Sequence, residues 1–360
     1  MKVLFLLTQL ESGGAQTRVV QTVQEAKKLN VDADLAFLYQ KRDCFTDVEK
    51  IILGKGGSTV SRLATGVANL ARLMFTRKYD VIITNTAPAN IIGNTLGKLF
   101  GVKTRIAYQT QPPQRLARFY RTLDLVAGSI GLYTRNIVNS EWTRSCFSQY
   151  PAAYLKRTEL LYDGVNLPRT SLSQGECRKA LGIPQSTYMA LNIGRLSKQK
   201  DQQTIIRAMA SVNGKLFIIG EGELRVQLEK LAASMSPGKV EFVGEVNREM
   251  LAMYLRAADV FCFSSLWETF GLALVEAASD GIPLVVTDLP VSREVLSVNN
   301  TMSQPISFVA PGDHEAFSAE INNLNTPEFS RSYHSELTEK FSIAMHTKNL
   351  IELSRRNRNN

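Results

Sequence analysis

Short apolar segments alternate with longer amphipathic stretches along most of the chain. The apolar segments have the length and composition of buried strands, and helical sequence follows them, as after Gly14 and over residues 61–78. Strands that alternate with helices predict parallel, doubly wound sheets. The predicted strands are KVLFLL (2–7), DADLAFLY (32–39), DVIITN (80–85), TRIAY (104–108), YMALNIG (188–194), KLFIIG (215–220), VEFVG (240–244), VFCFSS (260–265), PLVVTD (283–288) and ISFVA (306–310).

This rhythm breaks once, near the middle of the chain. Residues 160–176, LLYDGVNLPRTSLSQGE, are rich in turn-forming residues and predict a linker. A chain of 360 residues also exceeds the usual size of a single hydrophobic core. We therefore expect an α/β protein with a first domain over residues 1–167 and a second over residues 168–340. An amphipathic helix is expected within residues 341–360.

Two carboxylates flank the helix start in the segment SSLWETFGLALVEA. Helical composition begins at Gly271, which places Glu268 in the turn before the helix and Glu276 in its second turn. The first amides of a helix, here those of Phe270, Gly271 and Leu272, have no intrahelical partner and favour an anion. With a rise of about 1.5 Å per residue, Glu276 lies about 7–8 Å from Gly271, comparable to the span from a diphosphate to its ribose. The segment suits a nucleotide-sugar.

Cations and glycines occupy two other strand ends. Gly194 and Arg195 lie at the end of a predicted strand, and Lys200 follows just ahead of a helix. Arginine supplies a planar fork and lysine a point charge, so the pair can hold a diphosphate from the side. Gly13 and Gly14 form the turn between the first strand and its helix, a position where glycines also serve tight packing alone.

Together these features resemble the family 4, or group 1, retaining glycosyltransferases, which have the GT-B fold of two Rossmann-like domains facing a central cleft. The resemblance runs through almost the whole chain and is strongest over residues 190–294. It implies that the first domain binds the acceptor and the second binds the nucleotide-sugar donor. It also implies that the helix within residues 341–360 packs back on the first domain.

The resemblance implies a role for each site residue. Arg195 and Lys200 hold the diphosphate and, with Glu268, carry catalysis. Glu268 contacts the donor sugar, and Glu276 contacts the ribose. The glycine pair, Gly13 and Gly14, closes over the donor from the opposite domain. The other implied donor contacts are Gly194, Thr269, Phe270, Gly271 and Leu272, together with Val243 and Glu245 of the segment VEFVGEV, whose backbone faces the base.

One position departs from the family pattern. Many members carry a cleft histidine at the end of the strand that corresponds to TRIAYQTQPP, where this chain has Gln109. A glutamine can offer a carbonyl and an amide to a sugar hydroxyl, but it carries no proton at neutral pH. All three histidines lie in the last fifty residues. The departure leaves open an altered donor or an inactive relative.

Positive charge is concentrated in the first part of the chain. Residues 1–168 hold 22 Lys and Arg against 12 Asp and Glu, whereas residues 169–360 hold 20 against 21. The segment RLATGVANLARLMFTRK reads either as a membrane-surface helix or as a core helix with a solvated rim. An anionic membrane or a lipid-diphosphate acceptor fits the asymmetry better than nucleic acid, because no aromatic-basic recognition motif accompanies the charge. The basic candidates are Arg62, Arg72, Arg77, Lys78, Arg115, Arg118 and Arg121.

Two motifs for other chemistry are set aside. Asp32 and Asp34 have the spacing of a metal-binding pair, but they stand at the start of a predicted strand instead of following one. Gly220 and Gly222 begin like a dinucleotide fingerprint, yet the third glycine position is Arg225. We therefore expect neither a metal site nor bound NAD, and no cofactor besides the donor substrate.

Cysteine usage and the first apolar run bear on the compartment. The four cysteines, at 44, 146, 177 and 262, are scattered without paired spacing, as free cytosolic thiols are. The first apolar run is too short for a signal peptide or a membrane span. A cytoplasmic protein is expected, with a peripheral position on the inner face of the membrane suggested by the basic first domain.

These observations predict a glycosyltransferase that moves a sugar from a nucleoside-diphosphate donor to an acceptor hydroxyl. Family resemblance implies retention of the anomeric configuration. The basic first domain favours a lipid-linked saccharide as the acceptor, as in surface polysaccharide or lipopolysaccharide assembly. Two alternatives stay open: a transferase with a soluble acceptor, such as a glucan, disaccharide or small molecule, and a catalytically silent protein that binds a sugar nucleotide.

Overall fold

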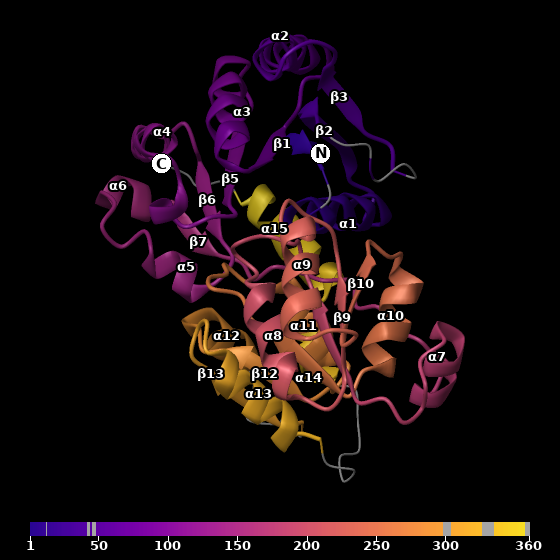
Figure 1. The fold of residues 1–360 in the computed structure, drawn as a ribbon. Helices are drawn as coiled ribbons and strands as arrows, with labels where there is room; N and C mark the ends of the chain where they lie inside the picture. Colours follow the sequence, from indigo (N-terminus) through magenta and orange to yellow (C-terminus); the bar gives the residue numbers. More distant parts are fainter. Residues whose placement is uncertain (12, 42–43, 45–47, 298–303, 326–334, 357–360) are drawn as a thin grey trace. The chain divides into compact units, whose positions relative to one another are not determined.

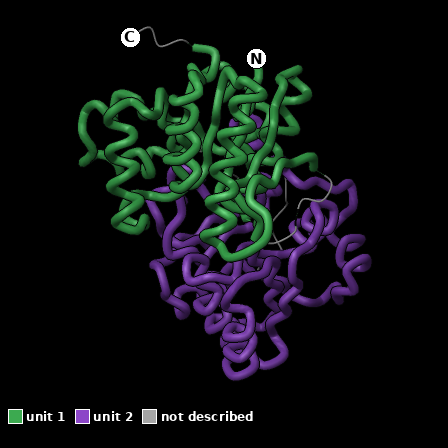
Figure 2. Tube along the Cα trace, turned by 90° about the horizontal axis from the view of Figure 1, so that it is seen from above, with its two compact units in different colours: residues 1–165, 341–360 green, residues 166–340 purple. Residues whose placement is uncertain are grey.

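The computed structural model describes residues 1–11, 13–41, 44, 48–297, 304–325 and 335–356. The chain forms two compact units, shown in Figure 1 and coloured separately in Figure 2. Unit 1 comprises Met1–Val165 with Phe341–Asn360, and unit 2 comprises Asn166–Lys340. The division expected from the sequence, after residue 167, falls in the same irregular segment.

Unit 1 is built on a parallel sheet whose described strands have the order β3-β2-β1-β4-β5-β6-β7. The strands are β1 (Lys2–Leu10), β2 (Asp32–Gln40), β3 (Ile51–Gly54), β4 (Val81–Asn85), β5 (Thr104–Gln109), β6 (Arg135–Val138) and β7 (Thr158–Leu160). The helices are α1 (Gly14–Lys28), α2 (Thr59–Arg77), α3 (Ala87–Leu99), α4 (Arg118–Ser129), α5 (Glu141–Ser145), α6 (Ala152–Leu155) and α15 (Ile343–Arg355), with a short 3₁₀ turn, η1 (Pro113–Arg115).

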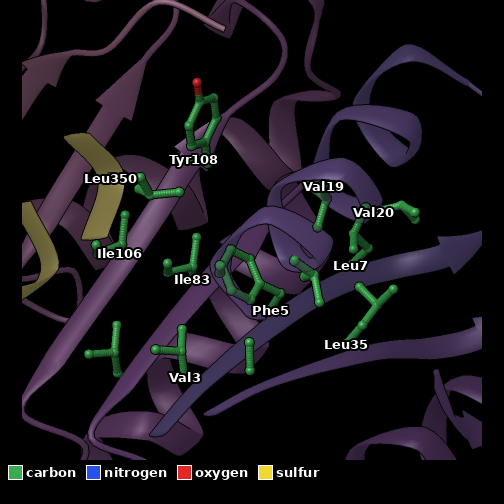
Figure 3. Packing of buried hydrophobic residues seen from close by; sticks show 14 of the residues in the cluster. Val3, Phe5, Leu7, Val19, Val20, Leu35, Ile83, Ile106, Tyr108 and Leu350 are labelled. Carbon is green, nitrogen blue, oxygen red and sulfur yellow. The ribbon is translucent and has the colours of Figure 1, made fainter. Parts of the chain in front are cut away.

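The central strand β1 contributes to two cores. Phe5 and Leu7 point to the face covered by α1 and α15, where they join the cluster in Figure 3. Leu4 and Leu6 point to the opposite face, which α2 and α3 cover. Successive side chains of a strand alternate between faces. Because both faces are buried, β1 reads as a continuous apolar run instead of an alternating one.

Main-chain bonds and close packing join α15 to unit 1. The amide of Val165 donates to the carbonyl of Phe341 (2.8 Å), and the amide of Ile343 donates to the carbonyl of Val165 (3.1 Å). Gly164 has no room for a side chain, since a Cβ there would lie 2.5 Å from the Cβ of His346. The chain therefore returns to unit 1 at the point where it first left it.

Unit 2 has a second parallel sheet, and its described strands have the order β10-β9-β8-β11-β12-β13. The strands are β8 (Met189–Ile193), β9 (Lys215–Ile219), β10 (Val240–Gly244), β11 (Val260–Phe263), β12 (Leu284–Thr287) and β13 (Ile306–Val309). The helices are α7 (Gln174–Leu181), α8 (Gln202–Ala208), α9 (Arg225–Met235), α10 (Arg248–Ala257), α11 (Leu272–Ser279), α12 (Pro290–Leu296), α13 (His314–Asn323) and α14 (Ser335–Lys340), with a 3₁₀ turn, η2 (Met209–Ser211).

Each sheet contains one point where the order of its strands reverses. In unit 1 the chain runs outward from β1 to β3 and then returns to β4 on the other side of β1. In unit 2 it runs outward from β8 to β10 and returns to β11. Open sheets of this kind bind ligands at the carboxyl ends of the two strands that flank the reversal. A ligand site of unit 2 is therefore expected at the loops after β8 and β11.

The predicted fold class, two parallel doubly wound sheets, is confirmed. Three short strands, β3, β6 and β7, were not among the predicted ones, because runs of three or four residues carry too little pattern to separate them from loops. As a result TRIAY, the fourth predicted strand, is β5 of the sheet. The placement of the two domains around a central cleft stays a prediction. Within the described ranges, every helix is too short or too polar to span a bilayer.

Arg18 of α1 lies at the centre of a buried polar cluster in unit 1. Its Nε lies 2.9 Å from Oδ1 of Asp163, and its Nη2 donates to Oδ1 of Asn85 (2.6 Å). The guanidinium lies 3.9 Å from the ring centroid of Tyr108, whose hydroxyl donates to the same Asp163 oxygen (2.7 Å). Burial of an ion pair is tolerated when each member is hydrogen-bonded, as here. The cluster ties α1 to β4, to β5 and to the chain leaving β7.

His346 of α15 packs beside this cluster as a neutral ring. Its Nδ1 lies 2.8 Å from the carbonyl oxygen of Tyr162 and donates to it in one neutral tautomer. Burial and the nearby charge of Arg18 lower the pKa of His346 to about 4. The unfolded chain therefore takes up the proton first as pH falls. The stabilisation from neutral His346 is complete above the unfolded value of about 6.5 and is lost as pH falls toward 4.

We expect His346→Asn, which keeps a donor near the Tyr162 carbonyl, to reduce the acid sensitivity of the fold. Between pH 7.5 and pH 5 the wild type should lose about 2 kcal/mol of unfolding free energy more than the variant, from the linkage of one such pKa shift. Urea unfolding at both pH values measures the difference.

His314→Asn is the matched control, because His314 is partly exposed on α13 of unit 2. Equal acid sensitivity of His346→Asn and wild type would show that His346 does not carry the effect.

Candidate active site

Several hydrogen bonds join the loops after β8 and β11. The amide of Leu266 donates to the carbonyl of Gln199 (2.8 Å), and the Gln199 side chain donates to the carbonyl of Trp267 (3.1 Å). The hydroxyl of Ser264 donates to the carbonyl of Lys200 (2.8 Å). The two segments that the sequence separates by more than sixty residues are thus held together at one edge of the sheet.

Lys200 and Glu268 form an ion pair between these loops. The ammonium group contacts Oε1 of Glu268, which also accepts from the hydroxyl of Ser265 (3.0 Å). The lysine stem lies over Gly194, where a Cβ would come 3.3 Å from three of its carbons. Glu268 is 7% exposed, so its carboxylate is nearly covered. Lys200 is therefore held in place by a carboxylate at its tip and by the absence of a side chain at Gly194.

Gly271 caps the helix that the sequence predicts. It has φ +92°, in the left-handed region, so a side chain at this position would be strained. Its carbonyl accepts from the amides of Leu274 and Val275, and α11 begins at Leu272. The first turn of α11 presents amide groups and the positive end of the helix dipole beside the Lys200 loop. Phe270 is buried, and Thr269 is partly exposed in the same turn.

Glu276 lies in the second turn of α11, as predicted from its spacing, and its side chain is paired. Nη1 of Arg248 donates to Oε1 of Glu276 at 2.9 Å. Burial raises the pKa of Glu276, and the Arg248 guanidinium acts in the opposite direction. Arg248, the first residue of α10, was not predicted as a site residue. The sequence could have indicated Arg248, because the helix dipole disfavours a cation at the start of a helix and such a residue is therefore more often kept for another role.

Tight main-chain contacts connect the loops after β8, β9 and β10. A Cβ at Gly220 would lie 2.2 Å from the carbonyl oxygen of Gly194, and a Cβ at Gly222 would lie 2.3 Å from that of Leu196. The two glycines therefore serve close packing between loops, and Arg225 pairs with Glu221 at 2.7 Å. Val243 is partly exposed at the end of β10, and Glu245 just beyond it is exposed, both at the sheet edge that carries Arg195.

The predicted residues of unit 1 lie at its own strand reversal or in its core. Gly13 caps α1, and its carbonyl accepts from the amide of Thr17 (2.9 Å), so the glycine pair occupies the predicted turn after β1. Asp34 is paired with Arg77 at 2.8 Å and also accepts from Tyr79. Among the described residues no group of three or more His, Cys, Asp or Glu is arranged to hold a metal ion.

Gln109 is buried in the interior of unit 1. The side chain is 2% exposed, and its amide nitrogen, with two N–H groups, lies within hydrogen-bonding distance of Oδ1 of Asp124 (3.0 Å), Oδ1 of Asn136 (2.9 Å) and the hydroxyl of Tyr154 (3.1 Å). Contact with a donor hydroxyl would require this amide to leave buried acceptors. Gln109 thus belongs to a buried network that joins α4 to the sheet, because Asp124 belongs to α4. Its expected contact with the donor stays a prediction.

Comparison with known proteins assigns unit 2 to a family. Residues 173–341 match the family model described as glycosyl transferases, group 1. Unit 2 is a group 1 glycosyltransferase domain. The galactosyltransferase of Escherichia coli that acts on α-D-GlcNAc-diphosphoundecaprenol is 25% identical over 238 residues, which cover 61% of each chain. An uncharacterized glycosyltransferase of Methanocaldococcus jannaschii is 31% identical over 150 residues, 39% of this chain and 38% of that one.

Solved structures resemble this chain over almost its full length. The Anabaena protein HepE, in complex with UDP-glucose, has a TM-score of 0.80 at 20% identity and covers 98% of this chain and 99% of its own. Sucrose-phosphate synthase from Thermosynechococcus elongatus has a TM-score of 0.81 at 19% identity, with 99% and 98% covered. At these identities the likeness shows the fold, which is GT-B.

We expect Gln109→Ala to lower the free energy of unfolding by about 1–3 kcal/mol, the cost of leaving buried polar groups without a partner. Chemical denaturation measures the change. Gln111→Ala, an exposed position two residues further on, is the matched control and should be nearly neutral. A folded Gln109→Ala protein with unchanged stability but weakened donor binding would instead show that Gln109 contacts the donor.

Proposed function

We propose that the protein is a retaining glycosyltransferase that moves a sugar from a nucleoside diphosphate to an acceptor hydroxyl. One observation carries the proposal: Lys200, Glu268 and the start of α11 come together at the strand reversal of a group 1 domain. Cations and helix amides at this edge match a diphosphate, and carboxylates match hydroxyl groups.

Catalysis in this proposal is electrostatic. As the bond between the sugar and the diphosphate breaks, negative charge grows on the diphosphate. Lys200, Arg195 and the first amides of α11 would stabilise that charge as preorganised groups. Glu268 keeps Lys200 at this position and offers a carboxylate to a sugar hydroxyl. The departing diphosphate accepts the proton of the acceptor on the same face, so no metal ion is required.

The acceptor is proposed to be a saccharide linked to a lipid diphosphate. The Escherichia coli relative named above acts on a diphosphoundecaprenol, and a Rhizobium meliloti relative, 34% identical over 112 residues, is a lipopolysaccharide core glycosyltransferase. The excess of Lys and Arg in residues 1–168 supports an anionic partner for unit 1.

The test is a panel of nucleotide-sugars incubated with the protein in EDTA. We expect one donor to be hydrolysed slowly, and transferred when a lipid-linked saccharide is added. Lys200→Ala should lower turnover about 10²–10³-fold, the usual effect of removing one preorganised charge stabiliser. Lys198→Ala, an exposed lysine two residues earlier, should retain wild-type turnover.

Other outcomes distinguish the alternatives. Transfer to a free sugar but not to a lipid-linked one indicates the soluble-acceptor enzyme. Tight donor binding without hydrolysis or transfer indicates a silent binding protein. Activity that EDTA abolishes and manganese restores contradicts the metal-free mechanism.

A membrane surface is proposed for the helices α2, α3 and α4 of unit 1. One face of the helix α2 packs on the sheet through Leu70 and Met74, as expected of a core helix. Its other face leaves Phe75 71% exposed, and Leu99 of α3 and Phe119 of α4 are also exposed. Apolar tips among basic residues are typical of a surface that binds anionic lipid. The cations on these helices or close to them in the sequence are Arg62, Arg72, Arg77, Lys78, Arg115, Arg118 and Arg121.

We expect the protein to co-sediment with anionic vesicles and to dissociate as salt rises, because each surface cation contributes about 1 kcal/mol that salt screens. Phe75→Ser combined with Phe119→Ser should reduce the sedimented fraction. Val226→Ser removes an exposed apolar side chain from unit 2 and should leave the sedimented fraction unchanged. Equal binding to neutral and anionic vesicles contradicts the proposal.

A further inference from the structure

Arg248 and Glu276 join two helices that leave the same edge of the unit 2 sheet at separate strands. Arg248 begins α10, which follows β10, and Glu276 belongs to α11, which follows β11. The strands β9 and β8 lie between β10 and β11 in the sheet. The contact of 2.9 Å between Nη1 and Oε1 therefore bridges the sheet edge at which the candidate site lies.

Neither helix needs this ion pair for its own stability. The cap of α10 is supplied by Asn247, whose side-chain oxygen accepts from the amide of Met250 (2.8 Å). A cation at the first position of α10 opposes the helix dipole. In α11, Glu276 is the charged residue of the sequence LALVEAAS and is 8% exposed among apolar neighbours. Because an ion pair that buries its carboxylate adds little stability compared with apolar residues of the same size, its presence calls for a functional explanation.

The atoms of the pair leave hydrogen-bonding capacity for a ligand. Arg248 uses Nη1 toward Glu276, whereas its Nη2 is buried and has no hydrogen-bond partner among the residues that the structure describes. The contact uses Oε1 of Glu276 and leaves Oε2 for another donor. A carboxylate oxygen beside a guanidinium nitrogen can accept from one hydroxyl and donate to a neighbouring hydroxyl oxygen.

We propose that Arg248 is a positioning residue for the ribose of the donor nucleotide: it fixes Glu276 so that the carboxylate accepts from the vicinal hydroxyls, and its Nη2 donates to one of them. The proposal rests on the proposed function, because it deepens the recognition of a nucleoside diphosphate at the same site. Arg248, which lies outside the two loops at the strand reversal, would then make this chain selective for ribonucleotides over 2′-deoxyribonucleotides.

Arg248 also sets the protonation state that this contact needs. Burial raises the pKa of Glu276, and the guanidinium opposes that effect. Without Arg248 the pKa of Glu276 rises further, and the carboxyl group becomes protonated at a higher pH. In an Arg248→Met protein the remaining preference for ribose should therefore weaken as pH falls, over a range in which the wild type keeps its preference.

The experiment compares ribonucleotide with deoxyribonucleotide binding. Calorimetry with UDP, GDP, ADP and CDP first identifies the nucleoside diphosphate that the wild type binds best, and its 2′-deoxy form is then titrated. We expect the wild type to bind the deoxy form about tenfold or more weakly, as for a lost hydrogen bond to a charged group. In Arg248→Met that ratio should fall toward one, mainly through weaker binding of the ribonucleotide. Arg248→Lys should retain part of the preference.

Arg256→Met is the matched control, because it removes a second ion pair between the same two helices. Nη2 of Arg256 lies 3.2 Å from Oδ1 of Asp280, the residue that ends α11. This variant is expected to lose stability but to keep the full ratio between ribose and deoxyribose forms.

The outcomes separate this inference from the proposed function. Nucleotide binding by the wild type with an unchanged ratio in Arg248→Met overturns the role of Arg248 and leaves the proposed function standing. An equal loss of the ratio in Arg256→Met also overturns it, because the effect then follows from the general packing of α10 on α11. A wild type that binds no nucleoside diphosphate overturns both.

Discussion

The parallel pairing of β8 with β11 is the interaction on which the candidate site depends. Ala190 pairs with Val260 and Leu191 with Phe261, although the two strands are distant in the sequence. This register brings the loop after β8 beside the loop after β11 and places Lys200 against Glu268. Because both strands are parallel, their carboxyl ends meet at one edge. The other candidate site residues of unit 2 also lie at or just beyond this edge of the sheet.

Two carboxylates at this edge are held in ion pairs. Lys200 pairs with Glu268, and Arg248 pairs with Glu276. Both carboxylates are largely buried, so each pair loses hydration that its attraction only partly restores. Such an arrangement contributes little to stability but keeps donors and acceptors oriented before a ligand arrives. Preorganised charge is what electrostatic catalysis of diphosphate departure requires.

Unit 1 uses buried polar groups for a different purpose. Arg18 with Asp163, and Asp124 with Gln109, connect helices and loops to the carboxyl ends of the strands. Each group is hydrogen-bonded to several partners, which allows burial without a large penalty. These networks fix α1 behind the glycine turn and α4 beside the sheet. The location of Gln109 in such a network explains why a polar residue at a strand end need not face a ligand.

The sequence by itself determined the alternation of strands and helices, because buried parallel strands must be apolar on both faces, as in β1. It also determined that a helix starts near Gly271 and that Glu276 lies in its second turn, since helix starts are set by neighbouring residues. Only the tertiary structure decided which side chains pair. Arg248 meets Glu276, and Gln109 turns to Asp124, through sheet order and the packing of helices on it. Those contacts join residues of different helices and strands, and a local sequence pattern does not predict which elements pack together.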